Sequence, residues 1–140
     1  MATYSVVLIV DVDTLKRLSQ ENKLGTDNSW ATIKINNGTP ITNPKDYVIT
    51  VHKDDVITWS GEALPSSDSG PQPVINITYI DFKTNEDKFS SKKQHLPIAG
   101  GATYEATANT ILDAVSYNID FIISYKHRIL DPKIKVIPKP

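Results

Sequence analysis

The sequence predicts an all-β fold: an antiparallel Greek-key β-sandwich of seven or eight strands with one short helix after the first strand. Short runs of β-branched and aromatic residues recur along the chain and are separated by turn residues, a pattern typical of antiparallel sheets. The helical period appears only once, directly after the first strand. An alternating strand–helix architecture does not fit, because no second helix is visible. The 140 residues suit one domain, residues 1–140.

The opening of the chain predicts the first strand and the helix. Tyr4 to Val12 is apolar and β-branched almost throughout, which indicates a strand covered on both faces. Asp13 is a candidate N-cap for a helix from about Thr14 to Asn22, in which Leu15 and Leu18 share one face.

A short strand and a hairpin are expected next. Trp30 to Ile35 reads as a strand that ends at the turn signal Asn36-Asn37-Gly38. Tyr47 to His52 and Val56 to Trp59 alternate in the manner of strands, and the acidic turn Lys53-Asp54-Asp55 lies between them. This spacing predicts that the two segments pair as a hairpin.

The middle of the chain alternates between polar segments and strands. Leu64 to Pro73 holds three prolines, three serines and a glycine, so we expect an exposed loop, and loops at sandwich ends often carry function. Val74 to Phe82 is predicted as a strand with Val74, Asn76, Thr78 and Ile80 on one side and Ile75, Ile77 and Tyr79 on the other. Further expectations are a turn at Lys83 to Lys88, a loop at Ser90 to Gly101 and a strand at Tyr104 to Thr107.

The clearest strand is Val115 to Tyr125. One face carries Tyr117, Ile119, Phe121, Ile123 and Tyr125, and the other carries Ser116, Asn118, Asp120, Ile122 and Ser124. This period of two indicates a half-buried antiparallel strand. After the break at Asp131-Pro132, Ile134 and Val136 suggest a final edge strand that Pro138 and Pro140 would blunt.

Composition excludes several classes of protein. The net charge of -1 and the pI near 6.3 argue against a sequence-independent nucleic-acid binder. The nearest thing to a basic cluster is Lys92-Lys93, which is expected in a solvated loop. The absence of cysteine excludes disulfides, thiol catalysis and a type-1 copper site. No apolar run is long enough for a membrane span, and Val6 to Val10 reads as a buried strand rather than a signal peptide. We therefore expect a cytoplasmic protein without membrane or nucleic-acid partners.

Candidate metal and catalytic residues are few. His52, His95 and His127 show no metal-ligand spacing, and we expect exposed or locally hydrogen-bonded imidazoles. Asp11 and Asp13 share a face and could hold a divalent cation, but an N-cap role explains Asp13 without any ion. No nucleophile elbow or phosphate loop is present, and Gly100-Gly101 reads as a turn. We expect no catalytic residues, no metal and no cofactor.

The aromatic residues leave two interpretations open. Core packing explains most of Trp30, Trp59, Tyr79, Tyr104, Tyr117, Phe121 and Tyr125. A sugar-binding site would need one exposed tryptophan or tyrosine beside Asp, Asn or Arg.

Three parts of the chain together resemble the AidA/PixA inclusion-body protein family. The first is Val7 to Leu15, an apolar strand that runs into an Asp-x-Asp-Thr turn. The second is the strand pair within Val51 to Trp59, and the third is Tyr117 to Phe121 with the closing segment Asp131 to Val136. The resemblance implies a bacterial cytoplasmic protein of undefined activity, and some members of the family accumulate as crystalline inclusions. It supplies no catalytic residues.

Two functions from different classes follow as expectations. The first is a non-enzymatic inclusion-body-type protein that self-associates into a homodimer or a larger assembly. The second is a β-sandwich module that binds a small ligand or a carbohydrate.

Overall fold

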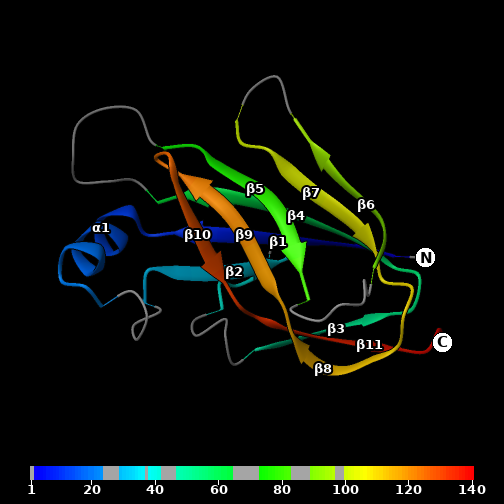
Figure 1. Cartoon of the computed structure of the whole chain (residues 1–140). Coiled ribbons are helices and arrows are strands. Elements are labelled where there is room, and N and C mark those ends of the chain that lie inside the picture. Colours follow the sequence, from blue (N-terminus) through cyan, green and yellow to red (C-terminus); the bar gives the residue numbers. More distant parts are fainter. Residues whose placement is uncertain are drawn as a thin grey trace.

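The computed structural model describes residues 2–23, 29–36, 38–41, 47–64, 73–82, 89–96 and 100–140. Within these residues the backbone forms eleven strands and one helix. The strands are β1 (Thr3–Val10), β2 (Ala31–Ile35), β3 (Val48–His52), β4 (Val56–Ala63), β5 (Ile75–Asp81), β6 (Ser90–His95), β7 (Thr103–Thr107), β8 (Leu112–Ser116), β9 (Asn118–Ile123), β10 (Lys126–Leu130) and β11 (Lys133–Ile137). The helix is α1 (Val12–Gln20), and it lies at the end of the molecule opposite both termini (Figure 1).

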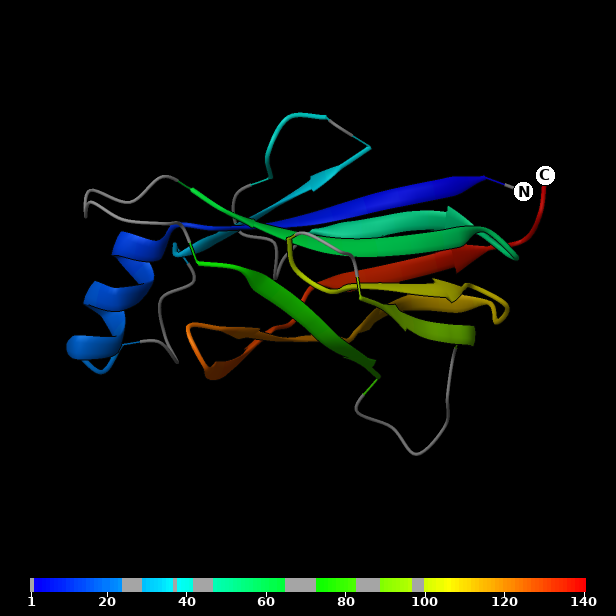
Figure 2. The same ribbon diagram turned by 90° about the horizontal axis from the view of Figure 1, so that it is seen from above.

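The strands form one five-stranded sheet and two three-stranded sheets. Their orders are β2-β1-β4-β7-β6, β10-β9-β5 and β3-β11-β8. Only β1 with β4 and β3 with β11 pair in parallel, and the other pairs are antiparallel. Seen from above, the strands run between α1 at one end and the chain termini at the other (Figure 2). The predicted all-β class with one short helix after the first strand is therefore confirmed.

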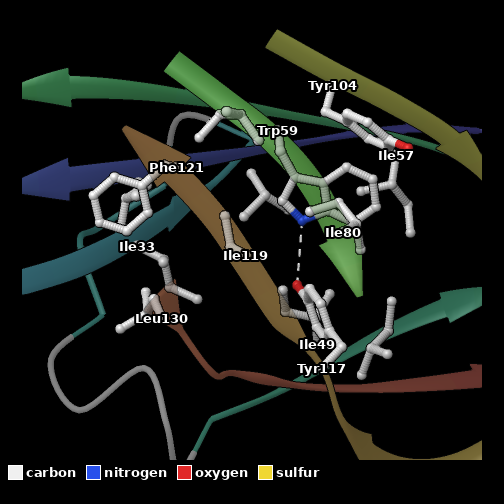
Figure 3. Close-up of a cluster of buried hydrophobic side chains, with 14 of the residues drawn as sticks. Ile33, Ile49, Ile57, Trp59, Ile80, Tyr104, Tyr117, Ile119, Phe121 and Leu130 are labelled. Carbon is white, nitrogen blue, oxygen red and sulfur yellow. Dashed lines mark hydrogen bonds between the residues drawn. The ribbon is translucent and has the colours of Figure 1, made fainter. Parts of the chain in front are cut away.

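Aromatic and β-branched side chains from all three sheets meet in one core. Trp59 of β4 is 6.2 Å, ring centre to ring centre, from Tyr117, which lies between β8 and β9. The Trp59 indole N–H donates a buried hydrogen bond of 3.2 Å to the Tyr117 hydroxyl (Figure 3). Ile49 of β3 and Phe121 of β9 are buried in the same cluster. The core thus holds the three sheets together.

The first strand and the helix follow the sequence, with one correction to the cap. Leu8, Ile9 and Val10 are buried in succession, as expected for a strand with neighbours on both sides. The predicted cap Asp13 is wrong, because Asp11 occupies the N-cap position and its carboxylate accepts from the Thr14 amide at 3.1 Å. The helix accordingly begins and ends two residues earlier than the predicted Thr14 to Asn22.

The predicted hairpin between Tyr47 to His52 and Val56 to Trp59 is wrong. β3 pairs with β11, whereas β4 pairs with β1 and β7 in a different sheet. The connection crosses between sheets because Asp55, a buried carboxylate, accepts from the amides of Ala2 and His52, each at 2.9 Å. One side chain thereby fixes the end of β3, the turn and the start of β1.

The predicted strand Val115 to Tyr125 is interrupted at Tyr117. β8 belongs with β11, and β9 lies between β5 and β10. Tyr117 is where the chain passes from one sheet to the other, and its amide donates to the Pro132 carbonyl at 3.0 Å. The buried face predicted for Val115 to Tyr125 is otherwise correct, except that Tyr125 is fully exposed in the turn before β10.

Three further expectations need correction. The first half of the predicted loop Ser90 to Gly101 is β6, which the pattern could not reveal because Ser90–His95 contains no apolar residue. β11 is the central strand of its sheet rather than an edge, and Pro138 lies beyond its end, where it removes no ladder hydrogen bond. The eleven strands exceed the expected seven or eight because β6 and β10 were not predicted and one strand is split.

Two expectations fall outside the described residues. They are the turn Lys83 to Lys88 and, except for its two ends, the loop Leu64 to Pro73.

Candidate functional site

One sheet face is the candidate site. In the β10-β9-β5 sheet, Ile77, Ile119 and Phe121 point into the core, so the alternate side chains point outward. We call these outward residues the outer face. The outer face consists of Asn76, Thr78, Tyr79, Asp81, Asn118, Asp120, Ile122, His127 and Ile129.

Three large apolar side chains on this outer face are open to solvent. Tyr79, Ile122 and Ile129 are 45%, 37% and 48% exposed. They come from three adjacent strands, and Tyr79 and Ile129 lie on either side of Asp120 in the register. An apolar group spread over neighbouring strands is typical of a binding surface, whereas single exposed residues are common on any protein.

A bulge in β5 places Tyr79 on the outer face. The pairing of β5 with β9 shifts between Ile77 and Tyr79, so Thr78 is an extra residue, and its hydroxyl donates to the Asp120 carbonyl at 3.1 Å. After the bulge, the positions that point outward and those that point into the core are therefore exchanged. The sequence pattern wrongly placed Ile80 with Asn76 and Thr78, and wrongly placed Tyr79 with Ile75 and Ile77.

Contacts from two neighbouring strands hold the Tyr79 ring. Lys92 of β6 donates to the Tyr79 hydroxyl at 2.8 Å, and its ammonium lies 4.0 Å from the ring centre. Tyr104 of β7 packs edge-on against the same ring at 6.0 Å. A tyrosine fixed in this way presents a rigid apolar surface. The expectation that Lys92-Lys93 lies in a solvated loop is wrong, because both residues are in β6.

Asp120 is the acidic group at the centre of the outer face. Burial raises the pKa of its carboxyl above the ordinary value, the nearby His127 lowers it, and Asp81 raises it further. The His127 imidazole Nε2 lies 3.9 Å from Asp120 Oδ2. Among the described residues, Asp120 Oδ1 has no hydrogen-bond partner. The face therefore combines apolar side chains with one poorly solvated carboxyl group.

The three histidines lie apart from one another, each beside one carboxylate. His52 faces Asp55, His95 faces Glu105 and His127 faces Asp120, with nitrogen–oxygen distances of 3.9 Å in each pair. No group of three or more His, Cys, Asp or Glu side chains placed to hold a metal ion is found within the described ranges.

The acidic residues singled out in the sequence have local roles. Asp11 caps α1, which accounts for its carboxylate without an ion, and Asp13 lies in the first helical turn. Asp54 forms an ion pair of 2.6 Å with Lys139, and the hydrogen bond from this lysine lowers the pKa of the Asp54 carboxyl. Asp54 and Asp55 do form a turn, and Asp54 has a positive φ of 72°.

The structure explains why positions 100 and 101 are both glycine. Gly100 has a φ of +88°, a conformation that side chains rarely adopt. A Cβ at Gly101 would lie 1.7 Å from the Ile75 carbonyl oxygen, so only glycine allows this close approach to β5. The next residue, Ala102, exchanges hydrogen bonds with Asn76 and Ile77 of β5.

The sequence pattern placed Asn118, Asp120 and Ile122 on the correct side of their strand but missed two of the three exposed apolar side chains, Tyr79 and Ile129. The bulge at Thr78 hid Tyr79, and β10 with Ile129 was not predicted. Ile122 did leave a signal, because it is the only isoleucine on the otherwise polar side of the Val115 to Tyr125 pattern. The aromatic residues behave as core packing predicts, apart from Tyr79 and Tyr125.

Comparison with known proteins identifies a structural neighbour that covers almost the whole chain. No protein-family model matches the chain, and no curated protein matches it in sequence. The crystal structure of the inclusion body protein PixA from Burkholderia cenocepacia J2315 superposes with a TM-score of 0.66. The chain shares the fold of a PixA inclusion body protein. The match covers 97% of this chain and 95% of that one at 10% sequence identity, so the fold implied by the AidA/PixA resemblance is confirmed.

In the part of the chain that the structure describes, α1 is the one helix. No helix among the described residues is long and apolar enough to cross a membrane.

Proposed function

We propose that this chain is a non-enzymatic, inclusion-body-type protein of the bacterial cytoplasm that acts by self-association. The observation that carries the proposal is the shared fold with the PixA inclusion body protein over 97% of the chain. The match is nearly complete on both sides, so it concerns the whole domain rather than a common strand motif. The sequence resemblance to the AidA/PixA family points the same way.

The outer face supports this proposal independently of the comparison. Tyr79, Ile122 and Ile129 form an apolar group on a sheet surface, and burying them against a second copy removes them from water. Asp81, Asp120 and His127 lie on the same surface, so polar groups can meet across a contact between copies.

The test is a double variant of the outer face, Ile122→Ser with Ile129→Ser. Losing two apolar contacts should raise the dissociation constant by roughly tenfold or more. A tenfold change corresponds to about 1.4 kcal/mol of binding free energy, and truncating interface residues that matter costs at least about 1 kcal/mol each. Sedimentation velocity over a range of concentrations measures the effect, and circular dichroism checks the fold.

A matched control is Ile111→Ser, since Ile111 is 50% exposed but lies outside the outer face. It should associate like the unmodified protein. If the double variant associates as tightly as the control, the outer face is not the contact between copies.

A second candidate function is carbohydrate binding, favoured by the half-exposed ring of Tyr79. Lys92 and Tyr104 fix this ring, and the polar groups of Asn76 and Asp120 lie on the same face. A sugar could stack on the ring and bond to these groups. Binding on a glycan array that Tyr79→Ala abolishes would support this function, and uniformly flat responses of the unmodified protein would reject it.

A further inference from the structure

The free edge of β3 carries backbone groups that pair with nothing in the described chain. β3 bonds on one side to β11, where Lys133 donates to the Tyr47 carbonyl and Lys53 donates to the Ile137 carbonyl. Backbone groups alternate in direction along a strand, so those of residues 48, 50 and 52 point away from β11. In Figure 1, β3 borders its sheet, with β11 beside it and β8 beyond.

Only two of these three residues have backbone groups without a hydrogen-bond partner among the described residues. The His52 amide donates to the Asp55 carboxylate at 2.9 Å, and the His52 carbonyl accepts from the Asp55 amide at 3.1 Å. Val48 and Thr50 receive no such hydrogen bond from any described residue, and Thr50 is exposed. The edge therefore offers two donors and two acceptors in a short row.

The other sheet edges are protected in ways that β3 is not. Lysine side chains stand on β2, β6 and β10, where exposed strands usually carry them to prevent pairing. β8 contains Asp113 and an irregular register against β11, and β5 is covered by Ala102. The first four residues of β3, Val48-Ile49-Thr50-Val51, carry no charged side chain, and His52 at its end faces Asp55. An uncharged β-branched edge strand is a template for another strand.

We propose that a second copy of this chain pairs antiparallel with β3 across a two-fold axis at Ile49. In that register Val48 of one copy lies opposite Thr50 of the other, and all four open groups of each copy are used. Val48 and Thr50 lie on the face of β3 opposite the buried Ile49 and Val51, so across the contact they form a β-branched cross-strand pair, which stabilises sheets. This inference rests on the proposed self-association and assigns a dimer contact separate from the outer face.

The pairing would join two three-stranded sheets into one of six strands. Because a two-fold contact uses the same surface on both copies, it closes after two chains. Growth beyond a dimer then requires a different surface, and the outer face lies on another sheet and stays available for it.

The principal test is Thr50→Pro in the full chain. Proline removes the amide hydrogen that points away from β11, so the ladder within the chain keeps its hydrogen bonds. The dimer loses two hydrogen bonds and the close approach of the strands, and its dissociation constant should rise by roughly tenfold or more. Thr50→Val is the matched control, because it keeps both the amide and the β-branch, and it should dimerise like the unmodified protein.

A second variant guards against a folding effect of proline. Thr50→Lys keeps the backbone amide and places a charge on an exposed side chain, as the other edges do. It should also weaken the dimer. Amide hydrogen exchange gives a direct readout in the unmodified protein, since the Thr50 amide should become protected only as the dimer forms. The amides of Ile49 and Val51, which face β11, should be protected at every concentration.

The outcomes separate this inference from the proposed function. Loss of dimer in Thr50→Pro and Thr50→Lys, with protection of the Thr50 amide in the unmodified dimer, supports it. If both variants assemble normally while the Ile122→Ser, Ile129→Ser protein does not, the β3 contact is overturned and the proposed function stands. A protein that stays monomeric overturns both the β3 contact and the proposed self-association. If the Thr50 amide becomes protected only when a foreign extended peptide is added, the β3 edge binds another partner and the dimer contact is overturned.

Discussion

The hydrogen bond between Trp59 and Tyr117 is the one polar contact between side chains at the centre of the aromatic core. Both side chains are almost completely buried, and burial raises the pKa of the Tyr117 hydroxyl well above its usual range. The hydroxyl therefore stays protonated and can accept from the indole N–H at any ordinary pH. Neutral polar groups that satisfy each other inside a core fix the relative position of the sheets that carry them.

Replacing Tyr117 with phenylalanine should destabilise the fold. The Trp59 N–H would keep its burial and lose its acceptor, which costs about 1–3 kcal/mol in the free energy of unfolding. Urea unfolding followed by tryptophan fluorescence measures the change. Tyr79→Phe is the control, since the hydrogen bond between its hydroxyl and Lys92 is open to solvent and its loss should change stability by less than about 0.5 kcal/mol. Equal losses in the two variants would contradict a structural role for the buried hydrogen bond.

The buried position of Asp120 leads us to expect that the difference in stability between the protein and its Asp120→Asn variant depends on pH. Burial raises the folded-state pKa of this carboxyl, so the folded state favours its protonated form. The resulting stabilisation is present below the unfolded-state pKa and is lost as the pH rises through the folded-state value. At a pH above both pKa values the carboxyl is ionised in the folded and the unfolded state, and there Asp120→Asn should be the more stable protein.

The advantage of Asp120→Asn should shrink as the pH falls toward about 3, where the aspartate becomes protonated. Thermal unfolding of both proteins across this range provides the comparison. A difference that grows on acidification would mean that His127, rather than burial, dominates the environment of Asp120.

Among individual residues, the core could be predicted and the candidate site could not. The burial of Trp59, Tyr117 and Phe121 follows from the strand periodicity. Large apolar side chains at alternate positions lie on one face of a strand, and that face turns toward the core. Tyr79 could not be placed, because a bulge reverses the side-chain phase without a sequence signal of its own. A correct strand assignment was therefore insufficient to find an exposed residue within it.

Among the elements, α1 depends on how the preceding strand ends. β1 ends at Val10, and Asp11 in an extended conformation then caps the helix two residues before the position that the spacing of the leucines indicated. Both Asp11 and Asp13 are acceptable caps by residue type. The choice between them is made by the length of β1 in its sheet, which the local sequence does not encode.

The two aspartates should therefore differ in their effect on stability. Asp11→Ala removes the acceptor of the Thr14 amide and should cost about 0.5–2 kcal/mol. Asp13→Ala removes a carboxylate from the first turn but leaves the N-cap in place, and the helix-dipole part of its effect should be about 0.3–1 kcal/mol. Chemical denaturation ranks the two variants. A larger loss in Asp13→Ala would argue for the cap that the sequence suggested.

The acidic turn between β3 and β4 explains why the hairpin prediction was wrong. Two alternating segments joined by a tight turn normally pair with each other. Here the Asp55 carboxylate binds the amides of His52 and Ala2, so the turn directs the chain into the other sheet. Within the described residues β3 therefore pairs with β11 on one side and has no strand on its other side.

At the scale of the whole molecule, the fold class was predictable and the pairing of the strands was not. Alternating patterns and turn residues determine that strands form, whereas pairing depends on contacts between distant segments such as β1 with β4 and β3 with β11. The polar strand β6 shows the limit most clearly, because its sequence carries no apolar residue and only its partner β7 defines it.

The whole molecule presents two surfaces that a second copy could use. The outer face offers apolar side chains, and the edge of β3 offers open backbone groups. They lie on different sheets, so one can close a dimer while the other joins dimers into a larger assembly.

Sedimentation velocity of the unmodified chain, from low micromolar to millimolar concentration, tests the central claim most directly. Self-association predicts a sedimenting mass that rises with concentration from 15.5 kDa to at least twice that value. A mass that stays at 15.5 kDa throughout the range would contradict it.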